Sequence, residues 1–326
     1  MTDKDYRIVT ERQVVDARQA MRRLSYDRPV KATVAGNVVD LVQTAVDPKE
    51  IPTVAIGKNA SGNLEYVDKR TGEIIEAKRS ETRGAAMSEK ELRKSFRKMR
   101  EIANANFFGD RNEIMVTLTY KENMQDSKKL YKDMEKFVKK AKRALGEIKY
   151  LAAVEPQERG AWHAHMLIKQ LNAHSTYWPA SDVADLWGHG YVKVTRLQKV
   201  DNVGAYLTAY LSNTADGGAE ELRKKMQEIM EAGDEVPKHI IKGARMSWYP
   251  RGTHIYRASK NCERPEPKKM RPHSADLQSV TAGAYPRYAQ VTKIYAEDSD
   301  GHRHLINTIT QIQLNSKCTY RGADEK

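Results

Sequence analysis

Two histidines and a glutamate form the pattern in this sequence that is best suited to chemistry. His163 and His165 are separated by one residue within an apolar run, and Glu155 precedes the first histidine by eight positions. Side chains alternate between the two faces of a β-strand, so the two imidazoles should lie side by side on one face of a sheet. Glu155 should reach the same face from a neighbouring strand, across a turn at residues 156–160. The spacing therefore predicts a His-His-Glu metal site on an antiparallel sheet.

The same spacing is also compatible with two partly exposed histidines that bind nothing. His302 and His304 repeat it, directly after the turn-forming residues 298–301 and without a preceding apolar strand. We interpret this second pair as surface histidines. The metal site is therefore a prediction that depends on the residues around the first pair.

Two tyrosines four residues apart provide a candidate nucleophile. Tyr206 and Tyr210 lie in a segment with helical spacing, which places their phenol groups on one face, one turn apart. Both can alternatively be core tyrosines, although Leu207 and Leu211 already supply an apolar stripe. A metal ion bound through imidazole and carboxylate would polarise a phosphodiester oxygen, and a tyrosine would attack the phosphorus in line. The product would be a phosphotyrosine linkage, from which the same site can rejoin the ends.

Hydrophobic periodicity predicts the elements that position these groups. We expect an α+β fold in which a central antiparallel sheet has helices on one face, of the ferredoxin-like split-βαβ type. The predicted strands cover residues 113–119, 148–155, 161–169 and 191–197. The predicted helices cover residues 88–104, 127–145, a short segment capped by Ser181 and stopped at Gly188, and residues 203–212, capped by Asp201 or Asn202.

The chain is predicted to contain three zones. Residues 1–84 form an N-terminal extension with a β-hairpin over residues 63–76, and residues 85–256 form the central domain, with its core at 112–215. Residues 257–326 form a basic arm, up to about residue 272, followed by a C-terminal β-hairpin over 288–314. A charged helix is expected over residues 220–232.

The charge balance points to a polyanionic partner. Lysine and arginine number 56 against 43 aspartates and glutamates in 326 residues, a net charge of +13, and nucleic acid is the commonest partner of such a protein. The two cysteines argue against a disulfide scaffold or a cysteine zinc site and favour a reducing cytoplasm. Because the sequence has neither an apolar run of about 18 residues nor a signal peptide, we expect a cytoplasmic protein with no membrane partner.

Four motifs in this sequence resemble those of the HUH endonucleases. The resemblance is closest to the replication initiators of rolling-circle plasmids and of filamentous and related phages. The motifs span about residues 112–215, a third of the chain, in the family's order. They are the strand Met115–Tyr120, the metal motif of Glu155 with Arg159–His165, the Trp-Gly-x-Gly turn within Leu186–Val192, and the Tyr-x-x-x-Tyr nucleophile motif from Tyr206 to Tyr210.

The resemblance implies the roles of the site residues. The histidines would lie on a middle strand, and His163, His165 and Glu155 would bind Mg²⁺ or Mn²⁺. Glu158 is an alternative third ligand, but Glu155 is preferred because it ends an apolar strand whereas Glu158 lies in a polar loop.

The nucleophile motif departs from the family pattern. Many relatives carry a lysine three residues after the tyrosine, and here Ala209 and Asn213 occupy those positions. Which tyrosine attacks is therefore open. Tyr206 is preferred, with Tyr210 as a second nucleophile or a phosphate-positioning group.

The implied function is initiation of rolling-circle DNA replication, by metal-dependent nicking and joining of one strand through a 5′-phosphotyrosine. The partner would be single-stranded or hairpin origin DNA, and a host helicase would unwind the duplex because the chain has no P-loop motif. Arg159, Lys128, Lys129 and Lys132 are the candidate DNA contacts, although the lysines can equally form a solvated helix face.

Other functions would use the same scaffold. One alternative is a DNA-binding regulator without catalysis, and another is a relaxase or a single-strand transposase with the same chemistry. In many relaxases the tyrosine precedes the histidines, whereas here it follows them. The oligomeric state is left open.

Overall fold

The computed structural model describes residues 7–46, 55–58, 64–67, 74–76, 89–156, 161–197, 200, 202–211, 249, 253–297 and 301–317. The chain divides into two compact units. The first unit combines Met1–Val34, Val38–Arg83 and Glu266–Lys326, and the second combines Ala35–Asn37 with Gly84–Pro265. All of the residues singled out for chemistry belong to the second unit.

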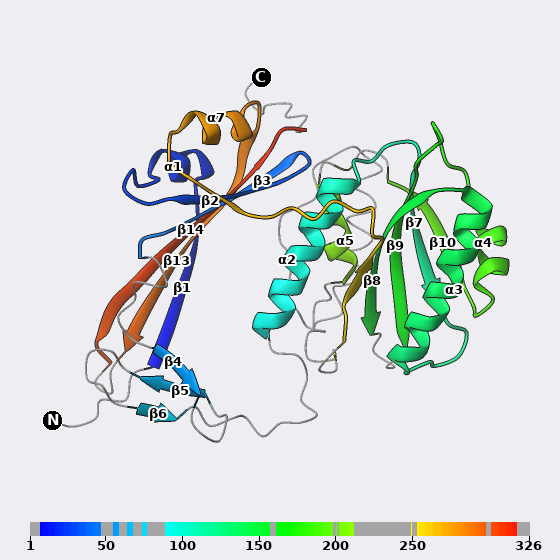
Figure 1. The fold of residues 1–326 in the computed structure, drawn as a ribbon, viewed down its shortest axis with the longest axis horizontal. Helices are drawn as coiled ribbons and strands as arrows, with labels where there is room; N and C mark the ends of the chain where they lie inside the picture. The colour runs from blue at the N-terminus through cyan, green and yellow to red at the C-terminus, as the bar shows by residue number, and fades with distance from the viewer. Residues whose placement is uncertain are drawn as a thin grey trace, which may run out of the picture. The chain divides into compact units, whose positions relative to one another are not determined.

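The second unit is built on an antiparallel sheet with the order β10-β7-β9-β8-β11 (Figure 1). Its strands are β7 (Glu113–Thr119), β8 (Ile148–Pro156), β9 (Trp162–Gln170), β10 (Val192–Arg196) and β11 (Tyr256–Ala258). Helices α3 (Ser127–Leu145) and α4 (Ala180–Trp187) connect β7 to β8 and β9 to β10, and α5 (Val203–Leu211) follows β10. Each helical connection joins two strands that have a third strand between them, which is the predicted split-βαβ arrangement. The histidine strand, β9, lies in the middle of the sheet as predicted.

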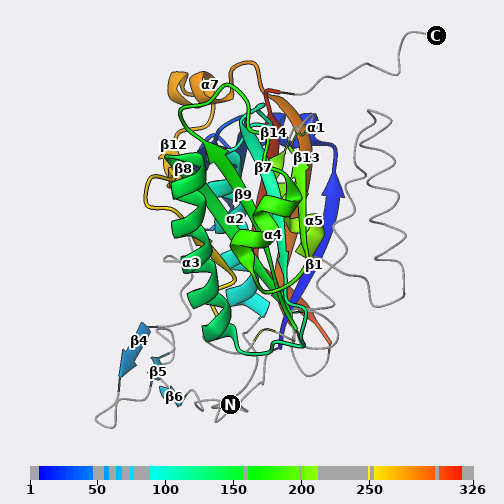
Figure 2. The same ribbon diagram turned by 90° about the vertical axis from the view of Figure 1, so that its right-hand side faces the viewer.

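Helices cover both faces of this sheet, which corrects the prediction of helices on one face. Helices α3 and α4 pack on one face with Val116, Ala164 and Met166. Helix α2 (Glu89–Asn106) and α5 pack on the other face, with Met115 and Leu167. Consecutive strand residues are thus apolar and buried on opposite faces, so both faces have to be covered. Figure 2 shows α3 and α4 in front of the strands.

Helix ends in the second unit follow capping chemistry. Asp126 Oδ1 accepts a hydrogen bond from the Lys128 amide at the start of α3, and Gly146 ends the helix with φ of 77°. Asn202 caps α5 as predicted, since its Oδ1 accepts from the Ala205 amide at 2.9 Å. Ser181 does not cap α4, because the helix starts at Ala180 with Pro179 in the N-cap position.

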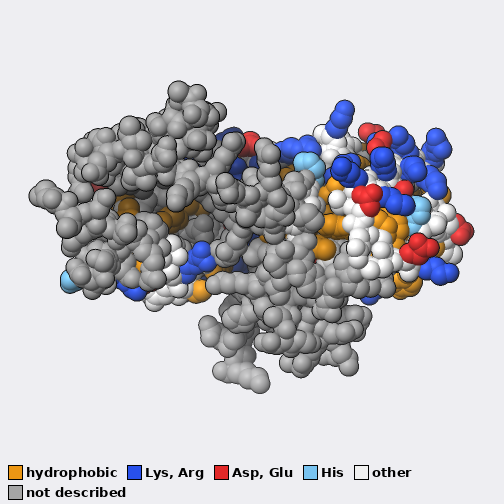
Figure 3. Space-filling view, turned by 90° about the horizontal axis from the view of Figure 1, so that it is seen from below, with side chains coloured by type: hydrophobic (Ala, Val, Ile, Leu, Met, Phe, Trp, Pro, Cys, Tyr) orange, Lys and Arg blue, Asp and Glu red, His pale blue; other side chains and the backbone are white. Residues whose placement is uncertain are grey.

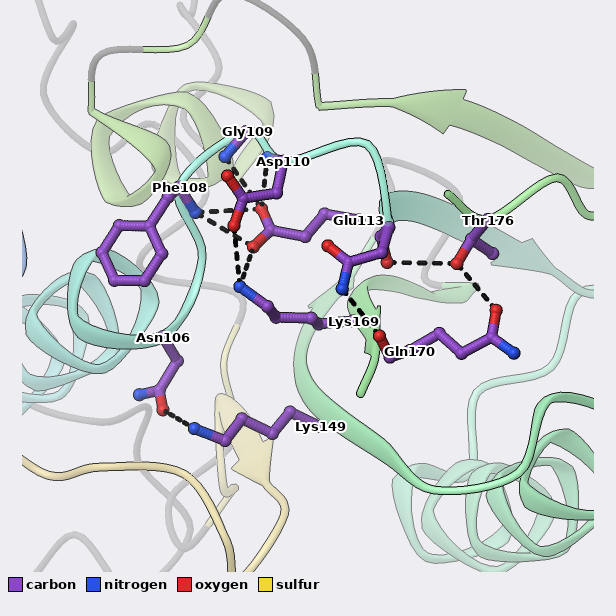
Figure 4. Close-up of polar contacts among 10 residues, drawn as sticks. Asn106, Phe108, Gly109, Asp110, Glu113, Lys149, Lys169, Gln170 and Thr176 are labelled. Carbon is purple, nitrogen blue, oxygen red and sulfur yellow. Dashed lines mark hydrogen bonds and ion pairs between the residues drawn. The ribbon is translucent and has the colours of Figure 1, made fainter. Parts of the chain in front are cut away.

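A buried carboxylate fixes the connection between α2 and β7 (Figure 4). Glu113 is fully buried, and its Oε2 accepts hydrogen bonds from the amides of Phe108, Gly109 and Asp110 at 2.9, 2.8 and 3.3 Å. Lys169 of β9 donates to Glu113 Oε1 at 2.8 Å and to Asp110 Oδ2 at 2.9 Å. The loop amides and the charge of Glu113 are therefore satisfied together, which fixes where the central strands begin and end.

The first unit joins strands from both ends of the chain in one antiparallel sheet of order β1-β13-β14-β3-β2-β12. Its core includes Val30, Leu41, Ala289 and Ile312. The predicted C-terminal hairpin is confirmed by the pairing of β13 with β14, and the predicted N-terminal hairpin by the pairing of β5 with β6. The elements are β1 (Arg7–Val15), α1 (Ala17–Arg22), β2 (Val30–Ala35), β3 (Val38–Thr44), β4 (Ala55–Lys58), β5 (Leu64–Val67), β6 (Ile74–Glu76), β12 (Lys268–Met270), α7 (Ala275–Thr281), β13 (Tyr285–Glu297) and β14 (Arg303–Asn315).

The segment predicted as a basic arm contributes strands to both units. Arg257 pairs with Ala152 within β11, and Lys269 pairs with Lys31 within β12, so neither stretch is an unpaired arm. The charged helix predicted over residues 220–232 lies outside the described residues. In the described part of the chain, no helix is long and apolar enough to span a membrane.

Candidate active site

The register of the central strands places the predicted metal ligands on one face of the sheet. His163 lies opposite Glu155 of β8 and Thr119 of β7, and His165 lies opposite Ala153 and Thr117. Directly opposed residues of an antiparallel pair share a face. Ala153 belongs to the apolar cluster formed with α2 and α5. The histidines and Glu155 therefore lie on the α2–α5 face.

His165 is held from both neighbouring strands. Its Nε2 lies 3.2 Å from Oε2 of Glu155, and its Nδ1 lies 3.1 Å from the hydroxyl oxygen of Thr117. A carboxylate only accepts hydrogen bonds, so in the neutral ring Nε2 donates to Glu155 and Nδ1 accepts from the Thr117 hydroxyl. His165 and Glu155 are both buried, with 5% and 2% of their surface exposed. The ring orientation is therefore fixed by partners on two strands.

His163 lies one step nearer to the start of β9. The residue is half-buried, and its Nε2 atom is buried. The structure thus brings His165 and Glu155 into contact and places His163 beside them on the same face, opposite Glu155 in the register.

The donor set fits a divalent ion in part. Two ligands at right angles around an ion, each bound at about 2.1 Å, lie about 3.0 Å apart, close to the separation of His165 Nε2 and Glu155 Oε2. Imidazole nitrogen with carboxylate oxygen is a donor set that Mn²⁺ accepts, whereas Mg²⁺ prefers oxygen. Within the described residues, however, no three His, Cys, Asp or Glu side chains converge into a metal-binding group. The structure supplies a ligand pair with a third candidate next to it.

Helix α5 places Tyr206 over the same face of the sheet. Tyr206 is 7% exposed and belongs to the apolar cluster that contains Met115 of β7 and Leu167 of β9. Its helix approaches α2 closely at Gly204, where a Cβ atom would lie 2.7 Å from the Arg100 carbonyl oxygen. The Gly204 amide also donates to Oδ1 of Asn104 at 2.7 Å. Glycine at this position therefore permits the packing that positions Tyr206.

The other predicted residues lie elsewhere or outside the description. Tyr210 lies in α5, one turn after Tyr206, but its side chain is not among those described. Arg159 and Glu158 lie outside the described residues. Lys128, Lys129 and Lys132 are exposed on α3, which covers the opposite face of the sheet.

Sequence reasoning gave no role to Thr117. It is polar in an apolar strand, and its position two residues before Thr119 places both threonines on the histidine face. This alternation was the available signal, but threonine is common in strands for packing reasons.

A second polar cluster surrounds the buried carboxylate of Asp133 on the other face. It accepts hydrogen bonds from the Tyr120 hydroxyl at 3.0 Å and from Lys129 at 2.5 Å, and His189 Nε2 lies 3.6 Å away. Burial favours the protonated acid, but the bonds from Lys129 and Tyr120 prevail and hold the Asp133 pKa below its ordinary value. Burial and the bond to Asp133 raise the pKa of Tyr120, which keeps that phenol protonated.

The Trp-Gly-x-Gly turn aligns β10 beside β7. Trp187 Nε1 donates to the Thr119 carbonyl at 2.9 Å, and the Lys121 amide donates to the His189 carbonyl at 2.8 Å. Gly190 has φ of 153°, and a Cβ atom there would lie 2.4 Å from the Lys121 nitrogen. The motif is therefore explained by close backbone packing at the end of β7.

Comparison with known proteins identifies one family. Residues 113–215 match the family model for the Replication-associated protein ORF2/gene II protein. This range begins at β7 and includes the two histidines, Glu155 and both tyrosines of α5. No curated protein and no solved structure is similar enough to the chain to match it.

Proposed function

Because residues 113–215 form a Replication-associated protein ORF2/gene II protein domain, from a family of rolling-circle replication initiators, we propose that this chain nicks and rejoins one DNA strand at a replication origin. One observation carries the proposal. His165 contacts Glu155 on the sheet face that α5 covers with Tyr206. A ligand pair and a phenol on one face are the groups that phosphotyrosine chemistry requires.

His165, Glu155 and His163 would hold a divalent ion, Mn²⁺ or Mg²⁺. When bound, the ion would polarise a phosphodiester oxygen and neutralise charge on the phosphate. Thr117 acts in the second layer, because its hydroxyl holds Nδ1 of His165 and so orients the ring.

Tyr206 would be the nucleophile. Its phenol oxygen forms a bond to phosphorus, the bond from phosphorus to the 3′ oxygen breaks, and the phenol proton is lost while the leaving oxygen gains one. The products are a 5′-phosphotyrosine and a free 3′ hydroxyl. Attack of a 3′ hydroxyl on the linkage reverses the reaction and rejoins the strand. Tyr210, one helical turn away, would provide a second nucleophile for the terminating transfer.

The substrate would be single-stranded or hairpin DNA of an origin. The excess of 13 positive charges favours a polyanion. The chain carries no P-loop motif, so a helicase supplied by the host would open the duplex.

A covalent-adduct assay tests this proposal. The protein is mixed with end-labelled single-stranded origin DNA and Mn²⁺, and the products are separated on a denaturing gel. We expect a metal-dependent band of protein-linked DNA, at least about 100-fold weaker in Tyr206→Phe and His165→Ala. Tyr191→Phe is the matched control, because Tyr191 is an exposed tyrosine outside the site.

Two results would contradict the proposal. Cleavage without an adduct would indicate hydrolysis, and tight binding without either product would leave only the DNA-binding regulator. An adduct lost in Tyr210→Phe and retained in Tyr206→Phe would keep the chemistry but exchange the roles of the two tyrosines.

A further inference from the structure

The outward side of α3 is entirely basic. Successive residues of an α-helix are turned by about 100°, so residues 128 to 143 can be placed around its axis. Within an arc of about 120° on the side away from the sheet, every position is Lys or Arg, and all of them are exposed. The seven residues of this basic arc are Lys128, Lys129, Lys132, Lys136, Lys139, Lys140 and Arg143.

The arc is not built as an ordinary solvated helix face. A stable surface helix places an acid four residues from a base, as Glu135 and Lys139 do here at 2.9 Å. Lys128, Lys132, Lys136 and Lys140 instead follow one another at spacings of four, which sets like charges beside each other. Such pairs destabilise a helix, so the arc is unfavourable for folding by itself.

Part of the basic arc already has partners within the protein. Lys129 and Lys136 lie 2.5 and 3.7 Å from Asp133, and Lys140 donates to the Leu186 carbonyl at 2.8 Å. No ion pair among the described residues involves Lys128, Lys132 or Arg143. These three therefore offer their charge outward.

We infer that the basic arc of α3 binds the sugar–phosphate backbone of duplex DNA. The arc is about 22 Å long, and a rigid row of charges of that length matches several successive phosphates. It carries no aromatic ring: Phe137 of the same helix is buried against the sheet. Single-strand sites combine charge with exposed rings on which bases stack, whereas a row of charge alone suits a duplex backbone. Figure 3 shows Lys and Arg side chains crowded on this end of the second unit.

The two surfaces meet at the start of β9. The Trp162 amide donates to the Met124 carbonyl, and Trp162 Nε1 donates to the Gln125 carbonyl at 2.9 Å. The residues that lead into α3 therefore pack against the residue next to His163. This inference rests on the proposed function in one respect: the arc would hold the duplex that adjoins the strand in the nicking site.

Duplex binding without chemistry tests the inference. The full-length chain is titrated into a fluorescent 30-bp duplex of arbitrary sequence, in EDTA, at several KCl concentrations, and binding is followed by anisotropy. The variant combines Lys128→Gln, Lys132→Gln and Arg143→Gln. The control removes the same charge from exposed positions of the first unit, through Arg12→Gln, Lys31→Gln and Lys268→Gln.

The α3 variant should bind the duplex at least about 10-fold more weakly at 100 mM KCl, and its slope of log K against log[KCl] should be shallower by about 2 to 3. Its thermal midpoint should equal or exceed that of the wild type, because like-charge pairs are removed. An equal loss in the control variant would overturn the inference. An equal loss on single-stranded dT30 would overturn the assignment to a duplex. Since EDTA excludes the covalent chemistry, failure of the adduct assay and failure of duplex binding are separate results.

Discussion

At the scale of single residues, the hydroxyl group of Thr117 fixes how the His165 ring presents its nitrogens. The hydroxyl lies 3.1 Å from Nδ1, while Nε2 faces Glu155 at 3.2 Å. A histidine that binds a metal through one nitrogen is usually held through the other, and that second partner affects affinity. Thr117 occupies this supporting position.

Thr117→Val should therefore weaken metal binding. Valine keeps the volume and the branching of the side chain but removes the hydroxyl, so the ring loses a fixed orientation. We expect Mn²⁺ affinity to fall about 10-fold or more in isothermal titration calorimetry. Thr195→Val is the matched control, since it removes a hydroxyl from the edge strand β10, and it should bind as the wild type does. Unchanged affinity in Thr117→Val would show that Thr117 does not support the site.

Individual site residues were predictable to different degrees. The spacing of His165 and Glu155 predicted two strands facing each other, and the register confirms that pairing. Thr117 was missed because a threonine in a strand is typical for packing alone. The burial of Tyr206 was equally beyond a helical pattern, because its depth depends on how closely α5 approaches α2 at Gly204.

At the scale of elements, Asp133 links α3 to the turn before β10. It accepts from Tyr120 at the end of β7 and lies 3.6 Å from His189. The pKa of the Asp133 carboxyl is lower in the folded chain than its ordinary value of 3.8, because the bonds from Lys129 and Tyr120 outweigh burial. The unfolded chain consequently takes up the proton first as the pH falls.

Asp133→Asn should destabilise the protein in a pH-dependent way. At pH 7 we expect the free energy of unfolding to fall by about 2 kcal/mol, as for loss of a hydrogen-bonded charged group. The stabilisation by the carboxylate is complete above the unfolded pKa and is lost as the pH falls through the lower folded pKa. Urea unfolding of wild type and variant at pH 7, 5 and 3 should show the difference shrinking below about pH 4. A constant difference across this range would contradict the assignment.

The elements themselves were predicted best where one pattern dominates. The bounds of β7 and α3 agree with the periodicity at both ends. The second helical layer was missed because alternation identifies two strand faces but not what covers each one. Strand β11 was missed because Tyr256–Ala258 is short and charged, and only its pairing with β8 makes it a strand.

At the scale of the whole molecule, the two units have separate hydrophobic cores. Leu41 is buried in the core of the first unit, and Leu130 in that of the second. All four tryptophans of the chain lie in the second unit. Tryptophan fluorescence therefore reports unfolding of the second unit.

Leu41→Ala should lower the stability of the first unit by about 3 kcal/mol, because the substitution leaves a cavity. Calorimetry should show a transition at lower temperature, while the tryptophan fluorescence transition stays in place. Leu130→Ala is the matched substitution in the second unit and should shift the fluorescence transition. A fluorescence shift of the same size in Leu41→Ala would mean that the two cores unfold as one.

The most direct measurement identifies the amino acid that carries the DNA. The covalent adduct formed with origin DNA and Mn²⁺ is digested with nuclease and protease, and the nucleotide-bearing peptide is sequenced by mass spectrometry. We expect the nucleotide on Tyr206, the tyrosine that α5 holds over the His165–Glu155 face. A nucleotide on a residue of the opposite face, such as Tyr120, would contradict a nicking site on the α2–α5 face.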